Sequence, residues 1–179
     1  MSILKVARMG HPVLRERARR VEPSAIAAPE FQRLIDDMFE TVDAHDGIGL
    51  AAPQVHQGVR LMLVGIDEAR EESDKDRASV PVIALINPEI TPVGSETVED
   101  WEGCLSVPGL RGRVRRPNDV RLVALDRKAG RVEMNLHGYP ARVVQHEADH
   151  LDGVLFVDRM ASLETLTFLE EYTKYWARD

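Results

Sequence analysis

The sequence has little of what secreted, membrane-bound or nucleic-acid-binding proteins rely on. One cysteine in 179 residues rules out a disulfide within the chain, which fits a reducing compartment. No apolar run is long enough to span a membrane, and the N-terminus lacks signal-peptide architecture. The net charge of -7, from 23 basic and 30 acidic residues, argues against a large nucleic-acid surface. These absences predict a cytoplasmic protein with neither a membrane nor a specific nucleic acid as partner, and they are also compatible with an organellar origin.

The chain is long enough for one domain with a real core, which we expect to cover residues 1–179. No internal repeats or low-complexity tracts are visible. Positive charge gathers locally in one cluster, made of Arg111, Arg113, Arg115 and Arg116. Length and composition therefore indicate an ordinary soluble globular protein.

The apolar pattern predicts helices at three places. In residues 29–44 apolar side chains recur at steps of three and four, which gives one stripe facing a core. A second helix is expected over 140–151, with Pro140 in its first turn and Gly153 after its end. A terminal helix is expected over 162–176.

Short apolar or alternating runs between turn residues predict strands. One of them, 82–86, is expected to stop at Asn87-Pro88. The almost wholly polar stretch 67–79 is expected to be an exposed, mobile loop. The other expected strands are 60–66, parts of 89–99 around a turn at Gly94-Ser95, 120–126, 131–136 and 154–157, with a hairpin turn at 127–130.

The strongest motif is His146-Glu147-Ala148-Asp149-His150, inside the predicted helix 140–151. Residues four apart lie on one helix face, so the two imidazoles can bind one metal ion. The Glu147 carboxylate can then reach a water on that metal, as in metal-assisted hydrolysis. The alternative is a chance pattern on a solvated helix face, so the rest of the chain must supply a third ligand and an oxyanion stabiliser.

Two other stretches are unusual. The segment 47–55 is small, apolar and uncharged, and its glycines let a backbone or a ligand approach closely. It lacks the Lys-Ser/Thr ending of a phosphate-binding loop, which leaves a buried turn as the alternative. Gln54 is an amide in apolar company and needs hydrogen-bond partners if it is buried. The lone Cys104 has three possible roles, as a small buried apolar side chain, as a nucleophile or as a metal ligand.

Three segments together resemble peptide deformylases. The similarity extends from Leu4 to about Met160, is weakest in 67–79 and in the final helix, and departs from the family pattern at no chemically essential position. Pattern and resemblance predict an α+β fold, in which small antiparallel sheets pack around a central helix carrying the His-Glu-x-x-His motif, with N-terminal and C-terminal helices. The matching residues are Gly47-Ile48-Gly49-Leu50-Ala51-Ala52-Pro53-Gln54, Glu102-Gly103-Cys104-Leu105-Ser106 and Gln145-His146-Glu147-Ala148-Asp149-His150-Leu151.

The resemblance implies a metal ion held by Cys104, His146 and His150, with water in the fourth position. Catalytic tetrahedral sites do use three protein ligands and a water, and a thiolate with two neutral imidazoles suits a first-row divalent ion. In this family the ion is typically Fe²⁺, and Zn²⁺, Ni²⁺ or Co²⁺ can occupy the site. Ligand softness alone would favour Zn²⁺.

The implied reaction is removal of the formyl group from the N-terminal formyl-methionine of new polypeptides. The metal-bound water attacks the formyl carbon, and Glu147 acts as general base and then as general acid. The Gln54 side chain and the Leu105 backbone N–H stabilise the oxyanion. The implied partners are formyl-methionyl nascent peptides and, as a candidate, the ribosome near its exit tunnel, in a bacterial-type cytoplasm.

Substrate binding is expected to use backbone more than side chains. The strand edge around Gly49 can add the nascent peptide as a further strand, and Gly103 can supply the opposite edge. Arg111 aligns with a family position near the substrate entrance, and a solvated strand charge is the alternative. The methionine pocket is expected from Ile48, Tyr139, Val143 and His146, with Glu102 and Arg142 at its rim.

Other polar residues have structural expectations. Asp149 is expected to brace the motif helix through an arginine such as Arg116. The remaining histidines, His11, His45, His56 and His137, are expected to be surface or structural residues.

Two rival functions use the same motif. A zinc endopeptidase would need a third ligand downstream, and Glu164 and Glu170 are available without a matching motif. A non-catalytic module stapled by metal would have a closed four-ligand site, and no fourth Cys or His lies in a motif. Cys104 upstream favours the deformylase, and Glu147 argues against an inactive family member.

Overall fold

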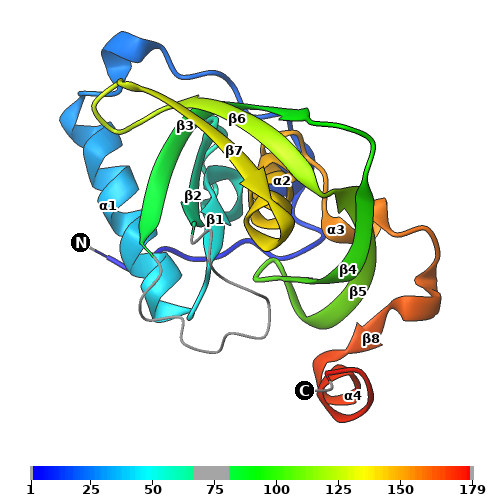
Figure 1. Ribbon diagram of the computed structural model, residues 1–179. Helices are drawn as coiled ribbons and strands as arrows, with labels where there is room; N and C mark the ends of the chain where they lie inside the picture. The colour runs from blue at the N-terminus through cyan, green and yellow to red at the C-terminus, as the bar shows by residue number, and fades with distance from the viewer. Residues whose placement is uncertain (1, 67–80, 178–179) are drawn as a thin grey trace.

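The computed structural model describes residues 2–66 and 81–177, so the predicted loop 67–79 lies outside the described residues. The predicted α+β architecture with small antiparallel sheets is confirmed (Figure 1). The strands are β1 (Gly49–Ala51), β2 (Leu61–Gly65), β3 (Val82–Pro92), β4 (Thr97–Cys104), β5 (Val107–Pro117), β6 (Asp119–Leu125), β7 (Arg131–His137) and β8 (Thr167–Phe168). The α-helices are α1 (Pro29–Ala44), α2 (Gly138–Leu151), α3 (Phe156–Arg159) and α4 (Leu169–Tyr175).

The strands form two sheets. One has five strands in the order β1-β2-β3-β6-β7, and the other has three in the order β4-β5-β8. Within the described part of the chain, β1 and β4 each pair with one strand only, so each leaves one backbone edge open. An open edge presents backbone N–H and C=O groups that can pair with another extended chain.

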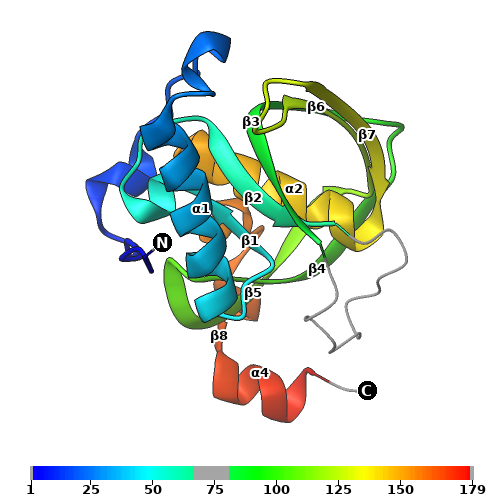
Figure 2. The same ribbon diagram turned by 90° about the vertical axis from the view of Figure 1, so that its left-hand side faces the viewer.

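The two long helices cover opposite faces of the five-stranded sheet. Alternate residues of a strand point to opposite faces, and β2 follows this rule. Met62 and Val64 pack in a core cluster with the α2 residue Val144, whereas Leu61 and Leu63 pack in a second cluster that includes α1 side chains. Figure 2 shows β3, β6 and β7 curving over α2. The motif helix is therefore held by apolar packing along one of its faces.

The predicted end of a strand at Asn87-Pro88 is wrong, because β3 runs on to Pro92. The pairing of β3 with β6 shifts register between Ile86 and Glu89, and the proline, which has no N–H to give to a ladder, sits in that irregularity. Asn87 has a φ of 51°, and its side chain accepts from Val21 N at 2.9 Å and donates to Val21 O at 2.7 Å. A bulge rather than a strand end accommodates this dipeptide.

The predicted strand 154–157 is also wrong, because α3 begins at Phe156. The Asp158 carboxylate accepts a hydrogen bond from Leu155 N at 2.7 Å and so satisfies a backbone donor at the start of this helix. Phe156 is fully buried, in a cluster with Val107 and Val114 of β5. An apolar run of four residues fits a buried helical turn as well as a strand.

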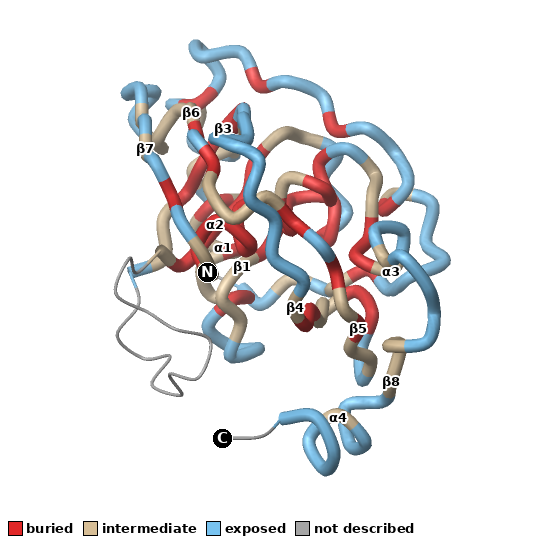
Figure 3. The backbone as a smooth tube through the Cα atoms, turned by 45° about the vertical axis from the view of Figure 1, so that its right-hand side comes forward, coloured by how far each residue is buried: buried red, intermediate tan, exposed pale blue. Residues whose placement is uncertain are grey.

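The predicted terminal helix over 162–176 is shorter than expected. Residues Leu163–Thr165 form a 3-10 helix, β8 follows, and only α4 is an α-helix. Phe168 pairs with Leu110 of β5, and Thr167 pairs with Arg111, which takes both residues out of any continuous helix. Figure 3 shows α4 mostly exposed, whereas buried residues concentrate in α2 and the strands around it. Among the described residues, none of the helices combines the length and the apolar character that crossing a bilayer needs.

Candidate active site

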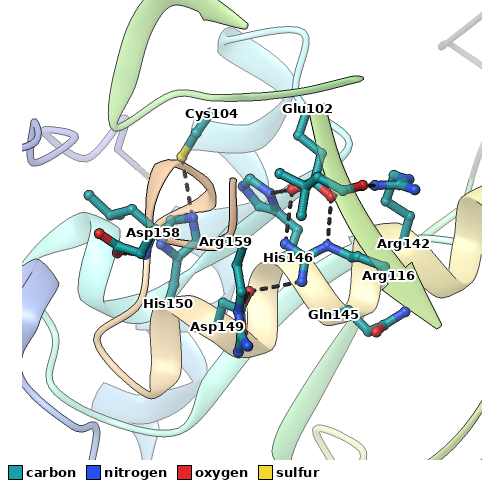
Figure 4. A network of polar contacts seen from close by, with 12 residues as sticks. Glu102, Cys104, Arg116, Arg142, Gln145, His146, Asp149, His150, Asp158 and Arg159 are labelled. Carbon is teal, nitrogen blue, oxygen red and sulfur yellow. Dashed lines mark hydrogen bonds and ion pairs between the residues drawn. The ribbon is translucent and has the colours of Figure 1, made fainter. Parts of the chain in front are cut away.

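The histidines of α2 and the cysteine at the end of β4 meet in one cluster (Figure 4). Cys104 Sγ lies 3.2 Å from His150 Nε2, and one ligand atom from each of Cys104, His146 and His150 lies within 4.8 Å of the others. A tetrahedral ion with these ligands would hold such atoms roughly 3.3–3.8 Å apart. The helical spacing of the histidines therefore brings both imidazoles close to the thiol, as a shared metal site would require.

The chemistry of these side chains fits a bound cation. Burial lowers the pKa of His150, which keeps its imidazole neutral with a lone pair to offer, and its buried Nδ1 has no hydrogen-bond partner among the described residues. His146 Nδ1 lies 2.8 Å from Glu102 Oε2, and an ionised carboxylate can only accept, so Nδ1 carries a proton and Nε2 is the ring atom that a cation can bind. Burial depresses the pKa of His146, but contacts with Cys104 and Glu102 outweigh it and raise the pKa, so a cation binding there would displace a proton.

Glu147 follows the first histidine and is itself buried. Burial raises its pKa to about 7, and its Oε2 has no hydrogen-bond partner within the described chain. A carboxyl group with this pKa can both take and give a proton near neutral pH. Gly49 of β1 leaves the space that this carboxylate occupies, because a Cβ at position 49 would lie only 2.8 Å from both Cγ and Cδ of Glu147.

Gln54 lies in the 3-10 helix Ala52–Val55 and is 2% exposed. Its Oε1 accepts from Ala51 N at 2.7 Å, which fixes the orientation of the amide because a backbone N–H can only donate. Its Nε2 then points to Ser106 Oγ at 3.2 Å and to Cys104 Sγ at 3.4 Å. The buried amide thus has the partners that its burial requires, and its N–H₂ group faces the thiol.

A buried ionic network joins α2 to the β4–β5 hairpin (Figure 4). Glu102 accepts from Arg116 at 2.6 and 2.9 Å, from Arg142 at 2.8 Å and from His146. Burial alone would raise the pKa of Glu102, but the hydrogen bonds from Arg116 and His146 lower it. Asp149 accepts from Arg116 at 2.8 Å, which confirms the predicted brace, and also from Arg159 at 2.6 Å. Glu102 and Arg142 are buried in this network, and both also line the cleft described next.

A cleft opens over the cluster between β1 and β4. Its wall includes Ile48, Tyr139 and Val143, the residues predicted for an apolar pocket. Gly103 and Arg111 also line it, and a Cβ at position 103 would overlap the Arg111 guanidinium group. The cleft therefore brings residues of β1 and β4, an apolar wall and several cationic side chains, Arg111 among them, to the same space.

The other histidines do not belong to the candidate metal cluster, although His11, His45 and His56 line the same cleft. His11 and His56 are exposed and contact each other edge to face at 4.7 Å between ring centroids. His45 contacts Thr41 O, and His137 contacts Asp119, each through Nδ1 at 2.8 Å. In residues 2–66 and 81–177, Cys104, His146 and His150 form the one group of His, Cys, Asp or Glu side chains that could hold a metal ion.

Sequence reasoning missed three contacts of this site. They are the acceptor role of Glu102 toward His146, the Ser106 hydroxyl beside Gln54, and Arg159 on Asp149. Strand alternation gave no reliable signal for the first, because the pairing of β4 with β5 shifts register between Glu102 and Cys104. Arg159 lies ten residues after Asp149, beyond the helix, and no pattern pointed to it.

The sequence and the structure of this chain are both similar to those of known proteins. Residues 3–166 match the family model described as polypeptide deformylase. A peptide deformylase of Leptospira biflexa is 42% identical over 175 residues, which cover 96% of this chain and 95% of that protein. A crystal structure of a class I type b peptide deformylase from Acinetobacter baumannii has a TM-score of 0.81 at 38% identity, covering 89% of this chain and 100% of that one. A Met-Ala-Ser-bound structure of the Acinetobacter enzyme has a TM-score of 0.79 at 36% identity, with the same coverage.

Proposed function

The chain belongs to the polypeptide deformylase family, and on this premise we propose that it removes the formyl group from the N-terminal formyl-methionine of newly made polypeptides. The observation that carries the proposal is the position of Glu147. Its buried carboxylate, whose Oε2 has no hydrogen-bond partner among the described residues, lines the same cleft as Cys104 and His146, which also includes residues of β1 and β4.

In this proposal Cys104, His146 and His150 hold one divalent metal ion, Fe²⁺, whose place Zn²⁺, Ni²⁺ or Co²⁺ can take. When bound, the ion supplies Lewis acidity toward the formyl group and the attacking water. Glu102 holds the proton on His146 Nδ1 and thereby keeps the other ring nitrogen available as a ligand. Metal analysis of anaerobically purified protein tests which ion is present.

Glu147 moves the proton. Its carboxylate takes a proton from the attacking water and delivers it to the amine that leaves, so that formate and a free N-terminus result. A pKa of about 7 supports both halves of this transfer near neutral pH. Burial also keeps bulk water from competing for the proton.

Two donors stabilise the negative charge that develops on the formyl oxygen. One is the Gln54 Nε2 group, whose orientation is set by the bond from Ala51 N. The other is the backbone N–H of Leu105, in the connection between β4 and β5. Donors fixed before the reaction need no reorganisation when the charge appears.

The substrate backbone pairs with the open edges of β1 and β4, at Gly49 and Gly103, as an added strand. The methionine side chain enters the apolar pocket beside Ile48, Tyr139 and Val143. Glu102 and Arg142 fix the shape of that pocket from within the buried network, and Arg111 lies near its entrance. Backbone pairing suits an enzyme whose substrates share only their first residue.

The other readings are not favoured. The endopeptidase would recruit Glu164 or Glu170, which are both exposed and belong to the 3-10 helix 163–165 and to α4. The candidate metal cluster instead contains the upstream Cys104. A closed four-ligand staple is not favoured either, because the described chain offers three ligand residues at this place.

As parts of the same proposal, residues 1–179 act as one catalytic domain in the cytoplasm, on formyl-methionyl nascent peptides. The ribosome near its exit tunnel is the proposed place of encounter. Co-sedimentation of the protein with purified ribosomes tests that contact separately from the chemistry.

The deciding experiment is an assay of formate release from formyl-Met-Ala-Ser by protein purified anaerobically with Fe²⁺. We expect release of formate without cleavage of the internal peptide bonds. Glu147→Ala should keep the metal and lose turnover by about 10²- to 10⁴-fold, whereas Cys104→Ala should lose the metal as well. Internal peptide cleavage without formate would sink the proposal.

A further inference from the structure

The cleft extends beyond the residues used above, to the C-terminal helix. Leu169 and Tyr172 of α4 line the same cleft as Glu147 and Gly103. Both lie after residue 166, where the match to the family model ends. The proposed chemistry gives these two side chains no role.

Specific contacts hold α4 against the substrate edge. The preceding strand β8 pairs with β5. Trp101 of β4 lies edge to face with Tyr172 at 5.0 Å between ring centroids, and 5.6 Å from Trp176. The Arg113 guanidinium carbon lies 5.5 Å from the Trp101 ring centroid. Since Trp101 lies two residues before Gly103, α4 is anchored beside the strand edge that we assign to the peptide.

The surface that α4 brings to the cleft is apolar and incompletely covered. Leu169 is 39% exposed, although it belongs to the wall of a cleft. A ligand side chain that covers apolar surface at such a place stabilises the complex, in proportion to the apolar area removed from water. A peptide bound at its first residue places its next residues within a few ångströms of that site, because an extended chain advances about 3.3 Å per residue.

We infer that Leu169 and Tyr172 form an apolar wall that contacts the two residues following the formyl-methionine and favours apolar side chains there. The inference rests on the proposed function, because it assigns a specificity wall to that same substrate. Burial of one apolar side chain in such a contact changes kcat/KM by about tenfold.

The test compares formate release from formyl-Met-Leu-Leu and formyl-Met-Ala-Ala by the holoenzyme. Wild-type protein should favour the leucine peptide by about tenfold in kcat/KM, mainly through KM. Leu169→Ala and Tyr172→Ala should bring this ratio close to one, whereas Tyr172→Phe should keep it, since the ring remains. The matched control is Tyr175→Ala, an exposed residue of the same helix outside the cleft lining, which should also keep the ratio.

Two outcomes overturn the wall. One is a wild-type ratio near one. The other is an unchanged ratio in both alanine variants, and if activity on both peptides falls equally, α4 acts only through stability. Thermal melts monitored by circular dichroism check that the variants are folded. Absence of formate from either peptide with wild-type protein is a different result, because it removes the proposed function and the wall with it.

Discussion

The contact between Gly49 and Glu147 makes a sharp test of the catalytic geometry. In Gly49→Ala, the new Cβ would lie 2.8 Å from Cγ and Cδ of Glu147, whereas carbon atoms approach each other comfortably at about 3.5 Å or more. The backbone at position 49 cannot retreat freely, because Gly49 pairs with Val64 in the antiparallel β1–β2 ladder. Oε1 of Glu147 would lie closer to the new Cβ than either carbon, so the side chain must move by at least roughly 0.7 Å, the difference between the two carbon separations.

This displacement should reduce kcat more than it harms the fold. Misplacing a reacting group by about 1 Å can cost about 10²-fold in rate, so we expect kcat for formyl-Met-Ala-Ser to fall by roughly 30- to 100-fold. Overpacking at a buried position costs about 1–3 kcal/mol, which urea unfolding would report. Metal content should stay at the wild-type level, because Glu147 is not a proposed ligand.

The matched control for this substitution is Gly58→Ala. A Cβ at position 58 meets no atom within 4 Å, so the same chemical change should leave kcat and stability nearly unaltered. A Gly49→Ala enzyme with kcat within threefold of wild type and full metal content would refute the reasoning. So would a loss confined to KM, which would mean that the methyl group blocks the peptide rather than the base.

Three other substitutions, measured by urea unfolding, test the protonation of Glu147, the buried ion pairs of Glu102 and the close packing at Gly153. In metal-free protein Glu147→Gln should be as stable as wild type near pH 4, and more stable at pH 8 by up to about 3 kcal/mol. The pKa of Glu147 in the folded state, about 7, exceeds its ordinary value of 4.5. Between these two values the folded state binds a proton that the unfolded state has released, so wild-type stability falls as pH rises through this range. A stability difference between variant and wild type that does not change with pH would contradict this. Glu102→Gln should cost about 3–5 kcal/mol, because Arg142 loses its charged partner and Arg116 keeps only Asp149. Glu133→Gln removes a carboxylate from an exposed pair and should change stability little, and equal losses would argue against the role of burial. Gly153→Ala should lower the free energy of unfolding by roughly 2 kcal/mol more than Gly94→Ala does. Both glycines have φ near 75°, but only a Cβ at position 153 would lie 2.7 Å from a backbone oxygen. Equal losses would mean that the backbone angle φ alone causes the destabilisation.

The two long helices could be predicted because their signals are local. The apolar spacing and the first-turn proline predicted a helix from Pro29 to about Ala44, and α1 has these bounds. The motif helix was expected over 140–151 and begins two residues earlier, at Gly138. Periodicity and capping act within one turn, so a single sequence contains them.

The end of β3 and the elements at the C-terminus could not be predicted in the same way. Whether 82–86 ends at Asn87-Pro88 depends on its pairing with β6, which lies about forty residues later in the chain. Whether 162–176 is one helix depends on β8 finding an open edge on β5. Both outcomes are decided by long-range partners, for which local propensity is a weak guide.

The position of Glu102 couples the stability of the fold to the proposed metal binding. A carboxylate that fixed only the His146 proton would be buried with a net charge, at a cost of several kcal/mol. Arg116 and Arg142 neutralise it, and Arg116 also reaches Asp149 on the motif helix. The Glu102 carboxylate, which orients the proposed ligand His146, is thus neutralised by the same ion pairs that hold α2 against β4 and β5. Loss of an arginine should consequently loosen the helix and release the imidazole together, so metal affinity and unfolding free energy should fall in parallel across substitutions in this network.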